Sequence, residues 1–200
     1  MKVMILAAGF GTRLFPLTID RTKPAIPFLG KPLVGYVAEN VAKFGFRDFV
    51  VNLHHQPDSV IDALGDGSAF GINIAYSIEE PNILGTSGAL DNARHLFDGE
   101  PVLIVNGKII TNIDIGTAAE AHRKSGAIAT MVLKPNVKRE RFTMIEIENG
   151  FVTGFGEFAH PFTENEIRDV EHDAAIAAVS MVTGTVMPQS RRPHDGPRLR

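Results

Sequence analysis

The sequence predicts an α/β protein built on a Rossmann-like, doubly wound and mostly parallel sheet with helices on both faces. The first observation behind this prediction is that short apolar runs alternate with helical patterns along most of the chain, which is typical of βαβ units joined by right-handed crossovers. The second is the Asn149-Gly150 pair between two alternating runs, which predicts a small antiparallel hairpin near the C-terminal end. The third is composition: 44% of the 200 residues are hydrophobic and 22% charged, as in globular domains.

The strands are predicted from short apolar runs, whose length is typical of strands buried on both faces. The runs that we expect in the parallel sheet are Lys2–Ala8, Phe49–Leu53, Ile72–Ile78, Pro101–Val105 and Ala127–Leu133. Thr143–Ile147 and Phe151–Phe155 are expected to form the hairpin, because apolar and polar residues alternate in both and an Asn-Gly turn joins them.

The helices are predicted between these strands from apolar residues spaced three or four apart. The first of them places Leu33, Val37 and Val41 on one face. Thr86 or Ser87 is expected to cap the third helix, because a hydroxyl side chain satisfies free N–H groups at a helix start. The expected helices are Leu33–Phe44, Ser59–Leu64, Thr86–Phe97 and Thr117–Lys124.

Two segments are expected along the chain: a domain over residues 1–157 and a diverged or disordered tail over residues 158–200. The periodicity fades beyond Glu157, and residues 188–200 are rich in Pro, Arg and Gly, a composition typical of disorder. The arginines of this last stretch are expected to be solvated rather than to bind nucleic acid, because it has no aromatic side chain for base stacking.

Charge and cysteine content exclude several classes of protein. A formal net charge of −3 gives no sign of a nucleic-acid or membrane partner. The chain has no cysteine, which excludes disulfides, zinc–thiolate sites and thiol catalysis. No cationic leader precedes the first strand and no apolar run is long enough to span a bilayer, so a cytoplasmic protein is expected.

The loop after the first strand combines glycines with basic side chains. Gly9-Phe10-Gly11-Thr12-Arg13 follows the strand directly, and Lys23 and Lys31 lie further along. Glycines let backbone N–H groups approach an anion, and guanidinium and ammonium groups bind phosphate oxygens. The P-loop pattern is absent, and the dinucleotide pattern lacks its third glycine because Leu14 stands there and Pro16 follows. The loop therefore indicates a polyphosphate site of another type, with a plain tight turn as the alternative.

The same loop carries a resemblance to a known family. The run Leu6–Thr18, with Lys23-Pro24, Pro27 and Gly30-Lys31-Pro32-Leu33, resembles the signature of the sugar-phosphate nucleotidyltransferases, in particular the mannose-1-phosphate guanylyltransferases. The resemblance spans residues 2–156 and implies a GT-A-like nucleotidyltransferase fold, with a C-terminal part that is truncated or diverged. It implies an enzyme that joins a sugar 1-phosphate and an NTP to give a nucleotide sugar and pyrophosphate. It also leads us to expect GTP or dTTP, a hexose 1-phosphate, Mg²⁺ as cofactor and a homo-oligomer.

The resemblance implies nucleotide-binding residues in three stretches. The first strand and its loop would hold the triphosphate through backbone N–H groups. Glu79–Leu90 resembles the family's L-G-T-A-G-A-L element, where small residues let the base lie against the backbone, and Ser87 replaces its alanine. A helix N-terminus is the alternative interpretation of that element. The implied residues are Leu6, Ala7, Ala8, Gly9, Gly11, Thr12, Glu79, Gly85, Thr86, Gly88 and Asn106.

The catalytic residues that the resemblance implies are Arg13, Lys23 and Lys108. Arg13 would stabilise the leaving pyrophosphate, and Lys23 would bridge the α-phosphate and the incoming sugar phosphate. Asn106-Gly107-Lys108 departs from the family's N-G-D, whose aspartate binds Mg²⁺, so Lys108 holds that position and cannot ligate a metal. A lysine there could neutralise a phosphate directly. No metal ligand is predicted, and Asp114 is expected to be structural, with a relocated metal as the alternative.

A second departure leaves three hypotheses open. Relatives carry a lysine after the hairpin that contacts the sugar's phosphate, whereas this chain reads Phe155-Gly156-Glu157-Phe158-Ala159. The first hypothesis is a working sugar-1-phosphate nucleotidyltransferase, the second a catalytically silent nucleotide-binding or regulatory subunit, and the third a fragment without a sugar pocket. The histidines, among them His54-His55, His95 and His122, lack the helical spacing of a metal site and are expected to be scattered.

Overall fold

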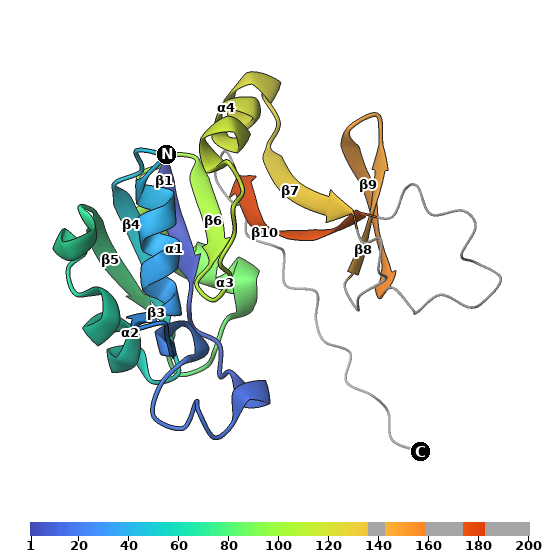
Figure 1. The fold of residues 1–200 in the computed structure, drawn as a ribbon. Coiled ribbons are helices and arrows are strands. Elements are labelled where there is room, and N and C mark those ends of the chain that lie inside the picture. Colours follow the sequence, from blue (N-terminus) through green and yellow to red (C-terminus); the bar gives the residue numbers. More distant parts are fainter. Residues whose placement is uncertain (136–142, 159–173, 183–200) are drawn as a thin grey trace, which may run out of the picture.

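The computed structural model describes residues 1–135, 143–158 and 174–182. Its main feature is an eight-stranded sheet in the order β5-β4-β1-β6-β10-β8-β9, with β7 also paired to β10 (Figure 1). The strands of this sheet are β1 (Lys2–Leu6), β4 (Asp48–Leu53), β5 (Asn73–Ile78), β6 (Val102–Asn106), β7 (Ala129–Pro135), β8 (Thr143–Glu148), β9 (Phe151–Phe158) and β10 (Ala174–Val182). A separate small hairpin consists of β2 (Pro27–Phe28) and β3 (Lys31–Pro32). The helices are α1 (Leu33–Ala42), α2 (Pro57–Leu64), α3 (Gly85–Asn92) and α4 (Ile115–Ser125), with short 3₁₀ turns η1 (Thr12–Leu14), η2 (Lys23–Ala25), η3 (Ser68–Phe70) and η4 (Arg94–Leu96).

The parallel part of the sheet confirms the predicted fold class. β1 pairs in parallel with β4 on one side and with β6 on the other, and β4 pairs in parallel with β5. The chain therefore builds β1, β4 and β5 outward in one direction and then returns to the other side of β1 for β6. In open α/β sheets, ligands bind beyond the carboxyl ends of the strands at such a reversal. The loops that follow β1 and β6 lie at this place.

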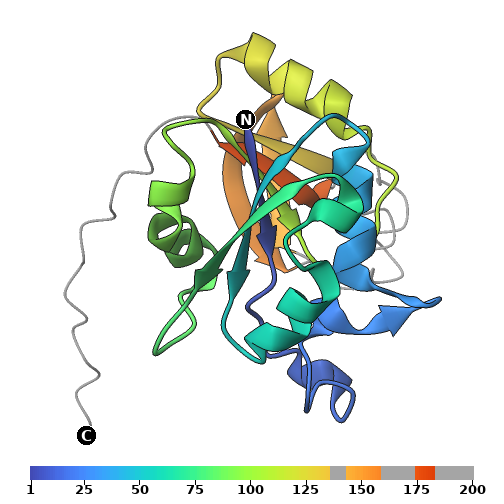
Figure 2. The same ribbon diagram turned by 90° about the vertical axis from the view of Figure 1, so that its left-hand side faces the viewer.

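Helices cover both faces of the parallel strands, as predicted. Along β1, Val3 and Ile5 belong to the core beneath α1, α2 and α4, whereas Met4 packs with α3. Figure 2 shows α3 on the opposite side of the sheet from α1 and α2. This alternation follows from the two-residue period of a strand, and it makes β1 rigid because all three side chains are fully buried. Within the described ranges, no helix is long and apolar enough to cross a membrane.

The third helix differs from its prediction at both ends. α3 begins at Gly85 with Leu84 as its N-cap, ends at Asn92 and is followed by η4 rather than continuing to Phe97. Neither Thr86 nor Ser87 supplies a side-chain cap. The predicted cap was wrong because a distant carboxylate satisfies the helix start: Glu79 Oε2 accepts a hydrogen bond from Leu84 N at 2.7 Å.

The far part of the sheet is antiparallel. It includes β7, which was expected over Ala127–Leu133 in the parallel sheet and which instead pairs antiparallel with β10. β8 and β9 form the predicted hairpin, and Asn149 and Gly150 adopt φ values of 50° and 81°, as a primed two-residue turn requires. β10 pairs antiparallel with β6, β7 and β8. No strand was predicted there, because four of its nine residues are alanine, which is depleted in strands. The predicted disorder of residues 188–200 and the departure at Ala159 lie outside the described residues.

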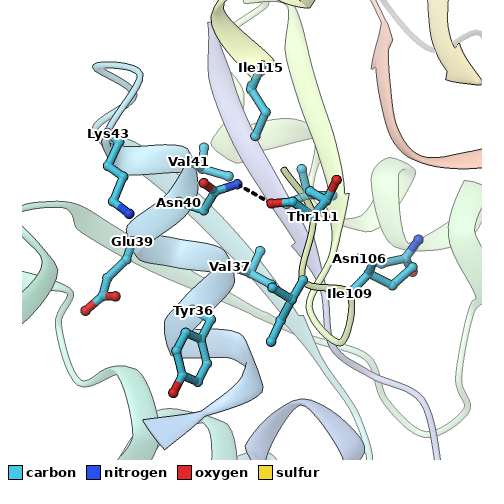
Figure 3. Close-up of a pocket in the computed structure, with 12 residues that line it drawn as sticks. Tyr36, Val37, Glu39, Asn40, Val41, Lys43, Asn106, Ile109, Thr111 and Ile115 are labelled. Atoms are coloured by element: carbon cyan, nitrogen blue, oxygen red, sulfur yellow. Dashed lines mark hydrogen bonds between the residues drawn. The ribbon is translucent and has the colours of Figure 1, made fainter. Parts of the chain in front are cut away.

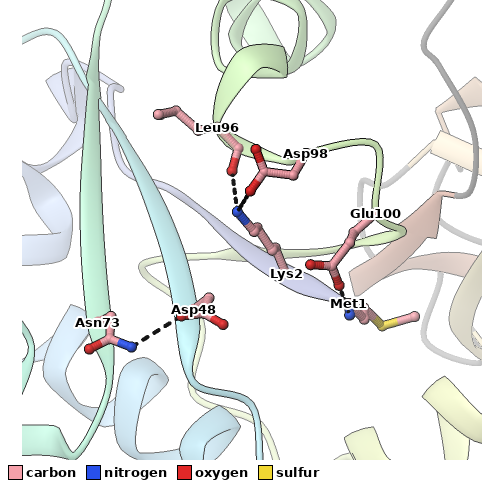
Figure 4. A network of polar contacts seen from close by, with 7 residues as sticks. All are labelled: Met1, Lys2, Asp48, Asn73, Leu96, Asp98 and Glu100. Carbon is pink, nitrogen blue, oxygen red and sulfur yellow. Dashed lines mark hydrogen bonds and ion pairs between the residues drawn. The ribbon is translucent and has the colours of Figure 1, made fainter.

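Cations at the amino ends of the strands have partners. Lys2 Nζ donates to Leu96 O at 2.8 Å and pairs with Asp98 at 2.5 Å, and the terminal amino group of Met1 pairs with Glu100 (Figure 4). These contacts fasten the start of β1 to the segment that leads into β6. Similarly, Asn73 Nδ2 at the start of β5 donates to Asp48 Oδ1 at the start of β4, at 3.1 Å (Figure 4).

Candidate functional site

The loop after β1 is folded back on itself at Gly11. This residue has φ 67°, a left-handed conformation that side chains other than glycine rarely adopt. A Cβ at this position would lie 2.9 Å from Thr18 Cγ2, so the space is also closed to a larger residue. Thr18 is buried, and its hydroxyl donates to Gly11 O at 3.2 Å. Gly11 therefore lets the loop return toward β1, which brings Arg13 and Lys23 to the same cavity.

A cavity of about 330 Å³ opens at the carboxyl end of β1. Its walls are the end of β1, the glycine loop, the η2 turn and the first residues after β6. The three cationic residues of the sequence analysis all line it. The lining residues are Leu6, Ala7, Gly9, Gly11, Thr12, Arg13, Leu14, Lys23, Pro24 and Lys108.

The three cations of this cavity repel one another. Burial lowers the pKa of the Lys108 ammonium group from its ordinary value, and the neighbouring charges of Lys23 and Arg13 lower it further. No residue in the described part of the chain forms an ion pair with Arg13, Lys23 or Lys108. An anion between them would relieve this repulsion, so the cavity has the charge of a phosphate-binding site.

A second cavity of about 170 Å³ adjoins the first and shares Leu6, Gly9 and Lys108 with it. The shared residues make the two cavities parts of one cleft, which we call the carboxyl-edge cleft. The second part reaches from β1 across the end of β4 to the start of α3. Its lining residues are Leu6, Ala8, Gly9, Asn52, Glu79, Ile83, Gly85, Thr86, Asn106 and Lys108.

A buried polar network fixes the floor of the cleft. Asn52, at the end of β4, is 4% exposed; its Oδ1 accepts from Ala7 N at 2.8 Å and its Nδ2 donates to Glu79 Oε1 at 2.6 Å. Glu79 is 1% exposed, and its other oxygen accepts from Leu84 N. Buried polar groups of this kind are held firmly because each lost partner leaves an unsatisfied group. The network thus sets the distance between the glycine loop and the start of α3.

Asn52 is a site residue that the sequence analysis missed. It lies inside an apolar run that reads only as a strand. Its contact with Ala7 depends on the parallel pairing of β1 with β4, which places Leu6 opposite Asn52. A polar residue near the end of a buried parallel strand was the only available signal.

Two histidines contact the loops of the cleft through hydrogen bonds. His54 Nδ1 donates to Glu79 O at 2.8 Å, and His55 Nε2 donates to Thr18 O at 3.2 Å. Phe10 contacts both rings, with centroids 5.4 and 5.5 Å away. The described residues contain no group of three or more potential His, Cys, Asp or Glu ligands.

Of the predicted site residues, Gly88 alone does not line the cleft. It lies inside α3, where a Cβ would come within 2.8 Å of Leu84 Cβ. Packing against the helix start is therefore the reason that the structure gives for a glycine here. Asp114 has the structural role expected for it: it caps α4, with Oδ1 accepting from Thr117 N at 2.8 Å.

The loop that carries Lys108 is fastened at both ends. Gly107 N donates to Leu6 O at 3.0 Å, and a Cβ on Gly107 would lie 2.9 Å from Ile5 Cγ2, so this residue must be small. Further along, Asn40 Nδ2 of α1 donates to Thr111 O at 3.4 Å (Figure 3). Figure 3 shows this contact at a separate cavity of about 150 Å³ between α1 and the loop. Lys108 is thus held at the junction of the two parts of the cleft.

The residues of the cleft do not fit a protein-bound Mg²⁺. Mg²⁺ takes oxygen ligands, usually one or two carboxylates. Glu79 is the one acidic residue among the described residues that line the cleft, and both of its oxygens already accept hydrogen bonds. Lys108 brings a positive charge instead, which repels a metal ion. The cofactor expected from the resemblance therefore has no open carboxylate ligand here.

The sequence is similar to a known family over most of its length. Residues 2–161 match the family described as nucleotidyl transferase. N-acetylmuramate alpha-1-phosphate uridylyltransferase of Neisseria meningitidis is 46% identical over 118 residues, which cover 59% of this chain and 51% of the relative. UTP–glucose-1-phosphate uridylyltransferase of Synechocystis is 36% identical over a stretch that covers 67% of this chain and 37% of the relative. Mannose-1-phosphate guanyltransferase of Yarrowia lipolytica is 34% identical over a stretch that covers 75% of this chain and 42% of the relative. The chain thus spans about half the length of these relatives or less.

Solved structures share the fold. A Bacillus anthracis protein described as a glucose-1-phosphate thymidylyltransferase superposes with a TM-score of 0.77 at 21% identity, covering 92% of this chain and 71% of that one. HddC from Yersinia pseudotuberculosis superposes with a TM-score of 0.73 at 24% identity, and the match covers 91% of this chain and 76% of that one. At these identities the likeness concerns the fold, including the parallel sheet with its antiparallel extension.

Proposed function

The chain belongs to the nucleotidyl transferase family, and we propose that it joins a sugar 1-phosphate to an NTP, giving a nucleotide sugar and pyrophosphate. One observation carries this proposal: Arg13, Lys23 and Lys108 line one cleft without ion-pair partners among the described residues, beside a second cavity that begins at the same β1 end. A triphosphate fits the cationic part by charge. The base and ribose would then enter the part lined by Asn52 and Glu79.

The proposed reaction is an in-line displacement at the α-phosphorus of the NTP. An oxygen of the sugar phosphate forms the new P–O bond, and the bond from the α-phosphorus to the bridging oxygen of the β-phosphate breaks. Pyrophosphate leaves with the electron pair of that bond. The attacking group is already an anion, so positioning and charge neutralisation carry the catalysis and no strong base is needed.

Each cation has a distinct part in this proposal. Gly9 and Gly11 offer backbone N–H groups to the triphosphate, as the open backbone of a glycine loop allows. Arg13 stabilises the charge that develops on pyrophosphate, and Lys23 bridges the α-phosphate and the sugar phosphate. Lys108, at the junction of the two cavities, neutralises the phosphate nearest the sugar. No step passes through Mg²⁺, because the described cleft residues offer no open carboxylate ligand.

Three nucleotides are candidates for the NTP substrate. The resemblance led us to expect GTP or dTTP with a hexose 1-phosphate. Two of the relatives named above are uridylyltransferases, so UTP joins GTP and dTTP as a candidate. A cytoplasmic location follows from the use of NTPs and remains part of the proposal.

A catalytically silent nucleotide-binding subunit is the second candidate. The lack of an open carboxylate in the described part of the cleft favours it, since charge neutralisation without a metal can hold a nucleotide without turning it over. The two functions differ in whether pyrophosphate is released.

The test is pyrophosphate release measured for the 200-residue chain. GTP, dTTP, UTP and ATP are paired with the 1-phosphates of mannose, glucose, N-acetylhexosamine and N-acetylmuramate. We expect turnover with one NTP. Calorimetric NTP binding without release from any pair would contradict the transferase and favour the silent subunit. If neither NTP binding nor pyrophosphate release were detected, both candidate functions would be overturned.

A further inference from the structure

We propose that the carboxyl-edge cleft binds its polyphosphate as the free anion, with Lys108 in place of a divalent cation, so that Mg²⁺ weakens binding instead of strengthening it. This inference rests on the proposed function for the identity of the ligand. It goes beyond that function because it states the charge form in which the ligand is bound.

The first support is the balance of charge in the cleft. Arg13, Lys23 and Lys108 supply three positive charges, and the one acidic residue among the described lining residues, Glu79, is buried and already accepts two hydrogen bonds. At neutral pH a triphosphate carries about four negative charges, because its terminal group holds nearly two. With the free anion the three cations leave a net charge of about −1, and with its magnesium complex they leave about +1, so the cations already present neutralise most of the anion's charge without a metal ion.

The second support is the position of Lys108. It belongs to both parts of the cleft, which is where a triphosphate would meet the rest of its nucleotide. The backbone just before it is held by the hydrogen bond from Gly107 N to Leu6 O, and the neighbouring Ile5 side chain leaves no room for a residue larger than glycine at position 107. The start of the Lys108 side chain is thus held at the junction of the two parts of the cleft.

The third support is the mutual repulsion of the cations before any ligand binds. The neighbouring charges of Lys23 and Arg13, together with burial, lower the pKa of Lys108. A further cation of charge +2 entering the same cleft would add to that repulsion, and at short range this effect is large. A polyanion removes it. Affinity should therefore follow the concentration of the metal-free ligand.

The experiment is calorimetric titration of the whole chain with inorganic tripolyphosphate and with UTP, GTP and dTTP, in EDTA and in excess Mg²⁺. Ionic strength is held equal and low, because salt screens these charges. We expect Kd in EDTA to be lower than in Mg²⁺ by about tenfold or more. Tighter binding in Mg²⁺ would overturn the inference and leave the proposed function intact. The absence of binding under both conditions would overturn both.

Variants at Lys108 sharpen the result. Lys108→Asp should reverse the metal dependence, because a carboxylate supplies the missing oxygen ligand. Lys108→Arg should keep metal-free binding, and Lys108→Met should weaken binding in EDTA more than in Mg²⁺. Lys124→Met removes a lysine that pairs with Glu120 on α4, so its metal dependence should match the native chain. If Lys108→Met and Lys124→Met behaved alike, the assignment to Lys108 would be wrong.

Discussion

Cationic groups at the two ends of the same strands differ in whether they have ion-pair partners among the described residues. At the amino end of β1, Lys2 pairs with Asp98 and the terminal amino group pairs with Glu100 (Figure 4). At the carboxyl end, Arg13, Lys23 and Lys108 line a cleft, and none of them has an ion-pair partner among the described residues. β1 and β6 contribute to both ends, since Lys2 lies opposite Val102 and Leu6 opposite Asn106.

This difference separates structural charges from functional ones. A paired lysine at the amino end fastens two segments and needs nothing else. Cations that face one another without partners destabilise the free protein and are retained where a ligand supplies the missing charge. The contrast predicts that substitutions at one end change stability, whereas cation substitutions at the other end change binding and turnover.

The largest effect is expected for Lys23→Met. This change removes one charge from the cleft and keeps the length of the side chain. Removing one such stabilising group typically lowers turnover by about 10²–10³-fold. The measurement is kcat for pyrophosphate release with the best substrate pair, together with the melting temperature. An unchanged kcat, or a large fall in melting temperature, would break the contrast between the two ends.

The buried network is expected to give the next largest effect, and it tests an exception to the contrast. Asn52→Leu removes the hydrogen-bond partner of Ala7 N and of Glu79 Oε1, so we expect the free energy of unfolding to fall by about 2–4 kcal/mol. Asn73→Leu is the matched control, because it breaks one exposed hydrogen bond to Asp48 at the amino end. Urea unfolding of both variants is the measurement. Equal losses would mean that burial of the network does not matter.

The sequence alone can predict only some parts of this site. Which parts it can predict depends on how far apart the residues lie in the chain. Gly9 to Arg13 follow a strand directly, so their meeting at its end was predicted from order alone. Asn52 and Glu79 could not be predicted as partners, because their contact depends on the register in which β5 pairs with β4. Nor could Lys108 have been placed beside Arg13 without the resemblance.

The same reasoning applies to the fold. The parallel strands were predicted because each is a contiguous apolar run with a helix after it. β10 was missed because it inserts next to β6 from far along the chain and because four of its nine residues are alanine. Its place comes from tertiary pairing rather than from local preference, which a single sequence does not reveal.

A smaller effect is expected for Lys2→Met. Its side chain is 17% exposed and its partner Asp98 is largely exposed, so the ion pair contributes modestly and we expect a loss of about 1 kcal/mol in unfolding free energy. Binding of tripolyphosphate should stay as in the native chain, because Lys2 lies at the opposite end of β1 from the cleft. Calorimetry and urea unfolding check the two halves of this prediction. Weakened binding would count against a purely structural role.

The smallest effect is a slope of stability with pH that arises at the cleft. The pKa of Lys108 is lowered in the folded chain, chiefly by burial and then by Lys23 and Arg13, from an ordinary value of 10.5. Between these two values the unfolded chain binds more protons, so the unfolding free energy of the ligand-free protein should rise with pH. Tyr76, whose pKa is raised to about 12, acts in the opposite direction only above its ordinary value of 10.0.

Urea unfolding from about pH 8 to about pH 10 measures this slope while most tyrosine stays protonated. Lys108→Met should flatten the rise, and Lys124→Met should preserve it. Tripolyphosphate binding should weaken over the same range, because the deprotonated amine no longer attracts phosphate. Stability that rises while binding falls is the combination expected of an unpaired cation that awaits a ligand. A lysine with a structural partner would instead lose its ion pair as it deprotonates, and the protein would lose stability. If Lys108→Met had the same slope of unfolding free energy with pH as the native chain, Lys108 would have to be counted among the structural charges, as Lys2 is.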